Sequence, residues 1–166
     1  RIDYVRAGRN RGEVVAAEAE TNTEQGSIAV LPFADMSPGK TQAFFSDGLT
    51  EELLNLLAKI PELRVAARTS SFSFRDSKLP IDSIARALHV NYVLEGSVRT
   101  AGDQVRITAQ LINAATGFHM WSETYDRELK DIFAVQDEIS SAIVRNLRLK
   151  LQPGTSAKLA QAGTAN

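Results

Sequence analysis

The sequence predicts an α/β fold: a single domain with a mixed sheet of about five strands, in the order β-α-β-α-β-β-β-α, and helices packed on the sheet. Two observations support this fold class. In the first half, short apolar runs alternate with stretches whose apolar residues recur at helical spacing. From residue 91 to 127, three runs alternate apolar and polar residues and are separated by turn residues, as in an antiparallel meander. With 166 residues, of which 43% are hydrophobic, the chain can build one core.

The first strand and the first helix are expected between residues 28 and 60. Residues 28–31 (Ile-Ala-Val-Leu) form a continuous apolar run, which is typical of a buried central strand. Apolar side chains between Leu49 and Ile60 then share one helical face, and Pro61 ends that helix. We therefore expect a core-facing helix directly after a central strand.

A second strand and a second helix follow. Residues 63–68 predict a short strand, which we expect to continue through the hydroxyl-rich residues 69–75. Pro80 stands where helices often begin, and residues 81–88 have one apolar face. Because these strands alternate with helices, they should pair in parallel through right-handed crossovers.

The three antiparallel strands are the clearest part of the pattern. In residues 105–112, apolar and polar side chains alternate, so one face of the strand should pack and the other should meet water or a partner. In the last strand, the same alternation places His119 and Trp121 on one face and Phe118 and Met120 on the other. Both faces then carry aromatic bulk, and we expect each to be partly covered.

The domain should end with a helix, because apolar residues keep a helical stripe over residues 132–147. We therefore place one domain at residues 27–151. Residues 152–166 are small and polar and are interpreted as a tail or linker. Residues 1–26 are interpreted as a linker, with a juxtamembrane position in a longer protein as the alternative.

Charge and composition narrow the function classes. The 19 basic and 20 acidic residues give a net charge of −1, which does not indicate nucleic acid or an anionic membrane as a partner. Any membrane contact should come from a segment outside this chain. There is no cysteine, and neither His89 nor His119 has a second ligand at metal-binding spacing. We predict no cofactor and no metal.

One segment suggests an enzyme-like alternative, a nucleotide-binding loop. Gly39-Lys40-Thr41 follows the first strand and precedes the first helix, as the end of a phosphate-binding loop would. However, Ala34 stands in place of the first glycine, and Pro38 removes a backbone N–H that could bind phosphate. A surface loop is the favoured interpretation.

The favoured ligand-facing candidate is the hydroxyl-rich segment. Ser70 and Ser71 lie between Arg68 and Arg75, a composition that can bind an anion or an extended peptide, although it also suits loops and caps. A serine nucleophile is not indicated, because no histidine base lies near these hydroxyls. Trp121 is a second candidate, as a partner hot spot, with burial in the core as its alternative.

Six segments occur in an order that matches a known family: SIAVLPFADMS, FFSDGLTEELLNLLAKI, LRVAARTSSFSF, ALHVNYVLEGSVR, VRITAQLINAATGFHMWSETYDR and DIFAVQDEIS. Together they resemble the TolB amino-terminal-like (FlgO-like) domain over residues 27–151. The resemblance implies a non-enzymatic module that follows a transmembrane helix and precedes tetratricopeptide repeats. It implies an adenylate cyclase or winged-helix output on the cytoplasmic side.

By this resemblance, the chain is expected to be a non-catalytic sensory or protein-interaction domain of a bacterial signalling protein. It would lie on the periplasmic side of the inner membrane, with a cytoplasmic location as the alternative. Its partner would be a protein or an unknown small ligand. The family supplies no catalytic residue; Asp47 and Arg68, which are charged and near strand ends, would pair or face a groove. The alternatives are nucleotide binding through Lys40 and a structural spacer that forms a homodimer through an exposed sheet edge.

Overall fold

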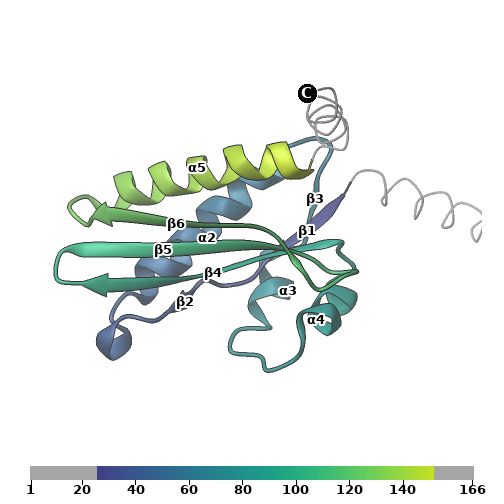
Figure 1. Ribbon diagram of the computed structural model, residues 1–166, viewed down its shortest axis with the longest axis horizontal. Coiled ribbons are helices and arrows are strands. Elements are labelled where there is room, and N and C mark those ends of the chain that lie inside the picture. The colour runs from purple at the N-terminus through teal and green to yellow at the C-terminus, as the bar shows by residue number, and fades with distance from the viewer. Residues whose placement is uncertain (1–25, 152–166) are drawn as a thin grey trace, which may run out of the picture.

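The computed structural model describes residues 26–151 as one sheet with helices on both of its faces (Figure 1). In chain order, the elements are β1 (Ser27–Val30), β2 (Ala34–Asp35), the 3₁₀ helix η1 (Pro38–Lys40), α2 (Ala43–Ala58), β3 (Arg64–Val65), α3 (Arg68–Phe72), α4 (Ile81–Leu88), β4 (Tyr92–Ala101), β5 (Gln104–Asn113), β6 (His119–Glu128) and α5 (Ile132–Leu151).

The sheet is mixed, as the sequence predicts. Its order is β3-β1-β4-β5-β6, and β2 pairs with β4 beyond the end of β1. β1 pairs in parallel with β3 and β4, whereas β4, β5 and β6 form the antiparallel meander. The α/β fold class is therefore confirmed. The sixth strand, β2, has only two residues and has no periodicity by which the sequence could reveal it.

The main core lies between the sheet and the helices α2 and α5. All four residues of β1 are buried, as expected for a central strand. From β5, one side chain in two points into this core, beginning at Val105 and ending at Leu111. The helices contribute fully buried side chains of the same kind, among them Leu49, Leu53, Leu57, Ile139, Ile143 and Leu147.

The opposite face of the sheet is only partly covered. At one end of this face, Ile84 and Ala85 of α4 pack against Leu31 and Val93 in a second, smaller apolar cluster. Figure 1 shows α3 and α4 on the side of the strands away from α5. The rest of the face carries the polar side chains of cross-strand neighbours, namely Glu95, Gln110 and Ser122, then Ser97, Thr108 and Thr124, then Arg99, Arg106 and Asp126.

A buried hydroxyl joins the segment that follows β1 to α2. Thr50 is fully buried; its Oγ1 accepts a hydrogen bond from the backbone N–H of Phe33 at 3.0 Å and donates one to the carbonyl of Ser46 at 2.9 Å. The substitution Thr50→Val keeps the shape but leaves that N–H without an acceptor, so we expect a loss of about 1–3 kcal/mol in the free energy of unfolding. Urea denaturation measures it. The exposed Thr124→Val is the control, and equal stability of the two variants would contradict the role given to Thr50.

A side-chain hydrogen bond also joins α5 to α2. Gln136 is buried, and its Nε2 donates to the carbonyl of Phe45 at 3.0 Å. The amide reaches this carbonyl across Gly48, where an added Cβ would overlap Nε2 of Gln136. This hydrogen bond therefore depends on the absence of a side chain at residue 48 of α2.

The expected continuation of the second strand through residues 69–75 is wrong. β3 ends at Val65, and residues 68–72 form the helix α3 instead. The reason is the length of the neighbouring strand: β3 pairs only with Ser27 and Ile28, and β1 itself ends two residues later. A longer β3 would have no partner for its backbone N–H and C=O groups, whereas a helix satisfies them internally.

The expected alternation in the last strand is also wrong at two positions, His119 and Met120. Trp121 lies opposite Leu111, but His119 lies opposite Ile112, so Met120 is the extra residue of a β-bulge. The bulge turns His119 to the partly covered polar face, while Met120 and Trp121 both pack against the main core. Phe118, just before the strand, is 76% exposed.

Candidate ligand-binding groove

Three of the six predicted site residues come together between α2 and α3. Arg75 Nη2 lies 3.0 Å from Asp47 Oδ1, and Arg68 Nε lies 3.4 Å from Glu51 Oε1. Both guanidinium groups lie over the ring of Phe72, that of Arg68 at 4.4 Å and that of Arg75 at 5.3 Å from the ring centre. These charges therefore pair with each other and hold α3 against α2. Because the pairs are half-exposed, their contribution to stability is small.

The other three predicted residues do not form a common site. Ser70 is exposed, and its carbonyl accepts a hydrogen bond from the hydroxyl of Ser73. Ser71 is fully buried, and its hydroxyl has no hydrogen-bond partner, so it is inaccessible to a ligand from solvent. Trp121 packs against the main core on the other face of the sheet. A binding site built from these serines and the tryptophan is not supported.

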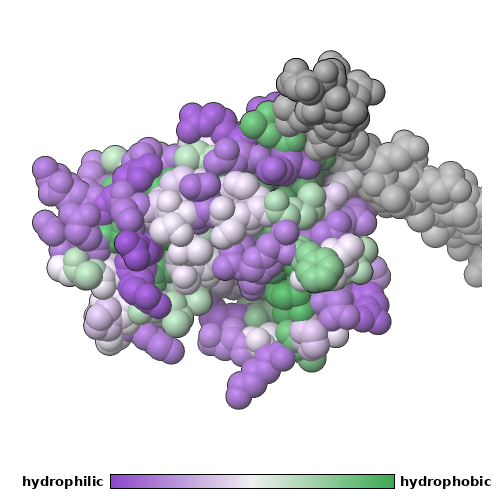
Figure 2. Space-filling model, in the orientation of Figure 1, coloured by the Kyte–Doolittle hydropathy of each residue, from purple (hydrophilic) through white to green (hydrophobic). Residues whose placement is uncertain are grey.

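The structure instead shows a groove of about 630 Å³ at the carboxyl end of β1. In open α/β sheets, this end of the parallel strands is the usual place for ligands. Figure 2 shows the molecule hollowed beneath the strands, with apolar side chains gathered on the side toward α3 and α4. We call it the Glu95 groove; it is lined by the segment from Leu31 to Met36, Lys40, Ala43, the segment from Phe74 to Ser77, residues 79–81, Ile84, Glu95 and Gly96.

The walls of the Glu95 groove are largely apolar. Phe74 and Ile84 belong to the second apolar cluster, beneath α4. Met36 and Leu79 line the groove from two different segments, and each is 53% exposed. Large apolar side chains that stay exposed beside a concave surface are typical of binding sites.

Glu95 is the unusual group in this groove. It lies in the middle of β4 on the partly covered face, half-buried. Burial raises the pKa of Glu95, and the nearby His119 opposes this only in part. Within residues 26–151, the Glu95 carboxylate forms no hydrogen bond or ion pair. A half-buried carboxylate without a partner is costly unless a ligand supplies one.

The other charged side chains of the groove do not compensate the charge of Glu95. Arg75 is paired with Asp47, and Lys40 lies close enough to Asp35 to lower its pKa. Asp76, which has a positive φ of 59°, has no ion-pair partner in the described part of the chain. Asp76 and Glu95 therefore leave the groove with uncompensated negative charge.

Asp35 explains why the Gly39-Lys40-Thr41 loop does not have the geometry of a phosphate site. Its carboxylate accepts the backbone N–H groups of Ser37 at 3.0 Å and of Gln42 at 2.7 Å. Burial raises the pKa of Asp35, but these N–H groups and Lys40 outweigh it, so the pKa lies below 3.8. Backbone donors that a phosphate would need before α2 are thus already bound to a carboxylate.

The raised pKa of Glu95 predicts a pH-dependent stability. A group whose pKa is higher in the folded than in the unfolded chain stabilises the fold below its unfolded value, here 4.5, and this contribution is lost as the pH rises through the folded value. We expect Glu95→Gln to have a higher melting temperature than the wild type at pH 7, with a difference that shrinks toward pH 4. Thermal melts across this range measure it. Exposed Glu123→Gln controls for a lost charge, and an equal gain there would contradict the role of burial.

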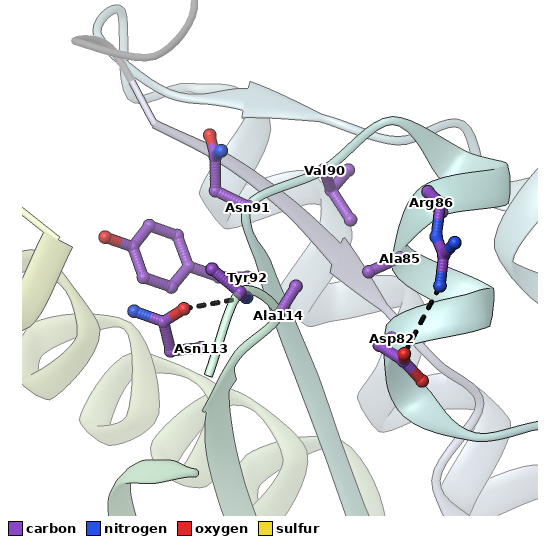
Figure 3. A pocket seen from close by; sticks show the side chains of 9 residues that line it. Asp82, Ala85, Arg86, Val90, Asn91, Tyr92, Asn113 and Ala114 are labelled. Atoms are coloured by element: carbon purple, nitrogen blue, oxygen red, sulfur yellow. Dashed lines mark hydrogen bonds and ion pairs between the residues drawn. The ribbon is translucent and has the colours of Figure 1, made fainter. Parts of the chain in front are cut away.

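A second concave site lies at the other end of the sheet, between α4 and the β5–β6 connection. It has a volume of about 520 Å³ and includes Tyr92 and Asn113. Figure 3 shows Asp82 and Arg86 on α4, facing each other as an ion pair of 3.3 Å. The Asn113 carboxamide oxygen accepts the backbone N–H of Ala115 at 2.9 Å. Because its charges are paired with each other, this site offers a ligand less than the Glu95 groove.

Neither a metal site nor a membrane-spanning helix occurs in the described residues. Between residues 26 and 151, no three His, Asp or Glu side chains are grouped as metal ligands. None of the helices in that range has the length and apolar character to cross a bilayer.

Glu95 and Asp76 were not among the candidates predicted from the sequence. A signal for Glu95 was present, since it is the one charged residue among the apolar and small residues of YVLEGSV. A charge inside such a strand indicates an open face or a site. The segments that surround Glu95, residues 31–36 and 74–84, are distant from each other in the sequence. No shared sequence pattern indicates that they form one groove.

Solved structures share this fold at low sequence identity. Lipoprotein GNA1162 from Neisseria meningitidis matches with a TM-score of 0.54 and 16% identity, over 74% of this chain and 96% of the other. A PelC dodecamer from Paraburkholderia phytofirmans matches with a TM-score of 0.51 and 21% identity, over 72% of this chain and 87% of the other. At such identities the likeness shows the fold alone.

Two sequence comparisons are more specific. A protein of Rhizobium meliloti (strain 1021) named "Putative adenylate cyclase 3" is 52% identical over 128 residues, which are 77% of this chain and 22% of that protein. The chain thus spans about a fifth of the length of this relative. The family model of the HilA/YgeH-like transcriptional regulator, second domain, matches residues 24–142. Both matches agree with the predicted association with signalling proteins, and the chain belongs to the family of HilA/YgeH-like second domains.

Proposed function

We propose that this chain is a non-catalytic sensory or protein-interaction domain of a bacterial membrane-associated signalling protein. The observation that carries the proposal is the Glu95 groove, which has apolar walls and an unpaired carboxylate. No serine hydroxyl that lines it is held by a histidine within the described residues. The relative that shares 52% of its residues over this domain supports a cyclase-like output, and the family match supports a regulator-like output.

The test uses the full-length protein that contains this domain. The output of that protein is either cyclic AMP synthesis or transcription. Glu95→Gln should change how strongly this output varies with growth conditions, while the maximal output stays the same. Glu123→Gln, outside the groove, should change neither. Turnover of a nucleotide or an ester by the purified chain would contradict the proposal.

The nucleotide-binding alternative can be tested on the purified chain. A ligand that binds only the folded state raises the melting temperature. We expect no shift with millimolar ATP and magnesium, because Asp35 holds the backbone donors before α2. A shift that is lost in Lys40→Ala would establish the alternative.

The location and the TolB amino-terminal-like relationship remain part of the proposal. We infer that the domain works on the periplasmic side of the inner membrane, between a membrane span and tetratricopeptide repeats, as the resemblance of the six segments implies. An alkaline phosphatase fusion after residue 151 in the intact gene should be active there. Activity of a fluorescent fusion that folds only in the cytoplasm would contradict this location.

A structural spacer that dimerises is favoured by one observation, the edge of β6. The backbone N–H of Leu129 donates to the carbonyl of Asp103, and the N–H of Asn113 donates to the carbonyl of Phe118. In an antiparallel pair, every second residue of a strand bonds to the neighbouring strand, so Glu123 faces β5 and the N–H and C=O groups of Ser122 and Thr124 point outward. Such an edge can pair with a second copy. Light scattering of the purified chain should then show a dimer, and a monomer at all concentrations would exclude the spacer.

A further inference from the structure

We propose that the Glu95 groove binds an apolar peptide segment that carries a lysine or arginine side chain, with the cation paired to the Glu95 carboxylate. This inference rests on the proposed sensory or interaction function and adds the chemistry of the partner.

The charge of the groove determines the sign of the ligand. Of the five charged side chains that line it, Arg75 is paired with Asp47, and Lys40 lies beside Asp35. Asp76 and Glu95 have no ion pair within residues 26–151, and the nearby His119 offsets the burial of Glu95 only in part. A cationic group would therefore find two carboxylates without an ion pair, whereas one of the two cations that an anion would meet, Arg75, is already paired with Asp47.

The position of Glu95 determines where the cation lies. Glu95 is on the floor of the groove, in β4, next to the apolar cluster of Leu31, Val93 and Ile84. An ammonium or guanidinium group that reaches it leaves bulk water. In such a place a charge-assisted hydrogen bond is stronger than one at the surface. It would also relieve the unfavourable burial of the unpaired carboxylate.

The apolar walls favour a peptide over a small amine. Met36, just after β2, and Leu79, before α4, both line the groove, and each is 53% exposed. A ligand that covers both needs apolar groups besides its cation. A peptide with lysine or arginine between apolar residues supplies this arrangement. The volume of about 630 Å³ is within the range of pockets that bind ligands of this size.

The experiment is a titration of the ¹⁵N-labelled chain, followed by two-dimensional NMR, with the peptide acetyl-Leu-Lys-Leu-amide. Backbone shifts should cluster at the groove, around Gly96, Asp76 and Ile81. Replacing the lysine by norleucine, which keeps the chain length and removes the charge, should weaken binding at least about tenfold. A glutamate at that position should abolish it.

Protein variants test the role of Glu95. Glu95→Gln should weaken binding of the lysine peptide about tenfold and leave the norleucine peptide unaffected, while Glu123→Gln should change neither. Because Glu95→Gln is expected to be more stable than the wild type at pH 7, weaker binding cannot come from unfolding. Equal binding of the lysine and norleucine peptides, shifts outside the groove, or full binding by Glu95→Gln would overturn the inference.

The source of the cation is tested with hexylamine, a free alkylammonium. Weaker binding of hexylamine than of the peptide supports the peptide. If hexylamine binds the groove as tightly as the peptide does, the groove is a site for small amines and the peptide inference is wrong. If the chain neither binds the peptide nor turns over a substrate, only this inference is wrong. If the chain catalyses turnover, the proposed function is wrong.

Discussion

Gly96→Ala is expected to destabilise the domain by about 3 kcal/mol or more, because there is no room for a side chain at this point of β4. A Cβ on Gly96 would overlap the backbone carbonyl oxygen of Thr108 and lie 2.5 Å from the ring carbon Cε2 of Phe33. The carbonyl belongs to β5, which is paired on both sides, and Phe33 is fully buried, so neither can move away easily. Denaturant unfolding followed by circular dichroism measures the loss.

Gly117→Ala is the matched control for this prediction. Gly117 has a positive φ of 77° and nothing within 4 Å of an added Cβ, so the variant meets only the backbone cost of that conformation, about 1–2 kcal/mol. If Gly96→Ala were no less stable than Gly117→Ala, the close contact between β4, β5 and Phe33 would not be important for stability.

The second large effect is expected from proline in β6. The ladder alternation places the N–H of Glu123 toward β5, so Glu123→Pro removes a hydrogen bond between the strands and forces a ring against β5. We expect a loss of at least about 2 kcal/mol in the free energy of unfolding. Thermal and urea denaturation would measure it.

Thr124→Pro is the control, one residue further along the same strand. Its N–H points away from β5, where proline is tolerated in edge strands, so we expect a change within about 1 kcal/mol. The same variant removes a donor that a second copy would need, and it should abolish a dimer formed through this edge. Equal destabilisation by the two prolines would contradict the assignment of the Glu123 N–H to β5 and of the Thr124 N–H to the free edge.

Most of the elements could be predicted from the sequence because their signals are local. The continuous apolar run in β1, the helical spacing in α2 and the alternation in β5 each lie within one segment. For the long elements the predicted spans overlap the observed ones, although α2 begins at Ala43, six residues before the predicted Leu49. β2 was missed and α3 was expected as strand, because these short segments are determined by which neighbours remain available for pairing.

The candidate site was predictable only in part. Asp47 and Arg68 could be singled out as charges near strand ends and Arg75 as a flank of the hydroxyl-rich segment, and the structure pairs the two arginines with carboxylates of α2. Of the predicted site residues, only Arg75 lines the Glu95 groove. Glu95 could have been noticed as a charge in an apolar strand, but not its lack of a partner.

By itself, the sequence determined the fold class, the central buried strand, the antiparallel meander and the resemblance to domains of signalling proteins. These follow from periodicity and from motifs, which require only neighbouring residues. The tertiary structure decided the rest: the bulge at Met120 turned His119 to the other face, and the pairing of β4 with β1 and β5 set Glu95 on the floor of a groove. The walls of that groove come from residues 31–43, 74–84 and 95–96, which are three separate segments of the chain. Which side chains meet there depends on strand register and helix packing, and local sequence patterns do not encode either.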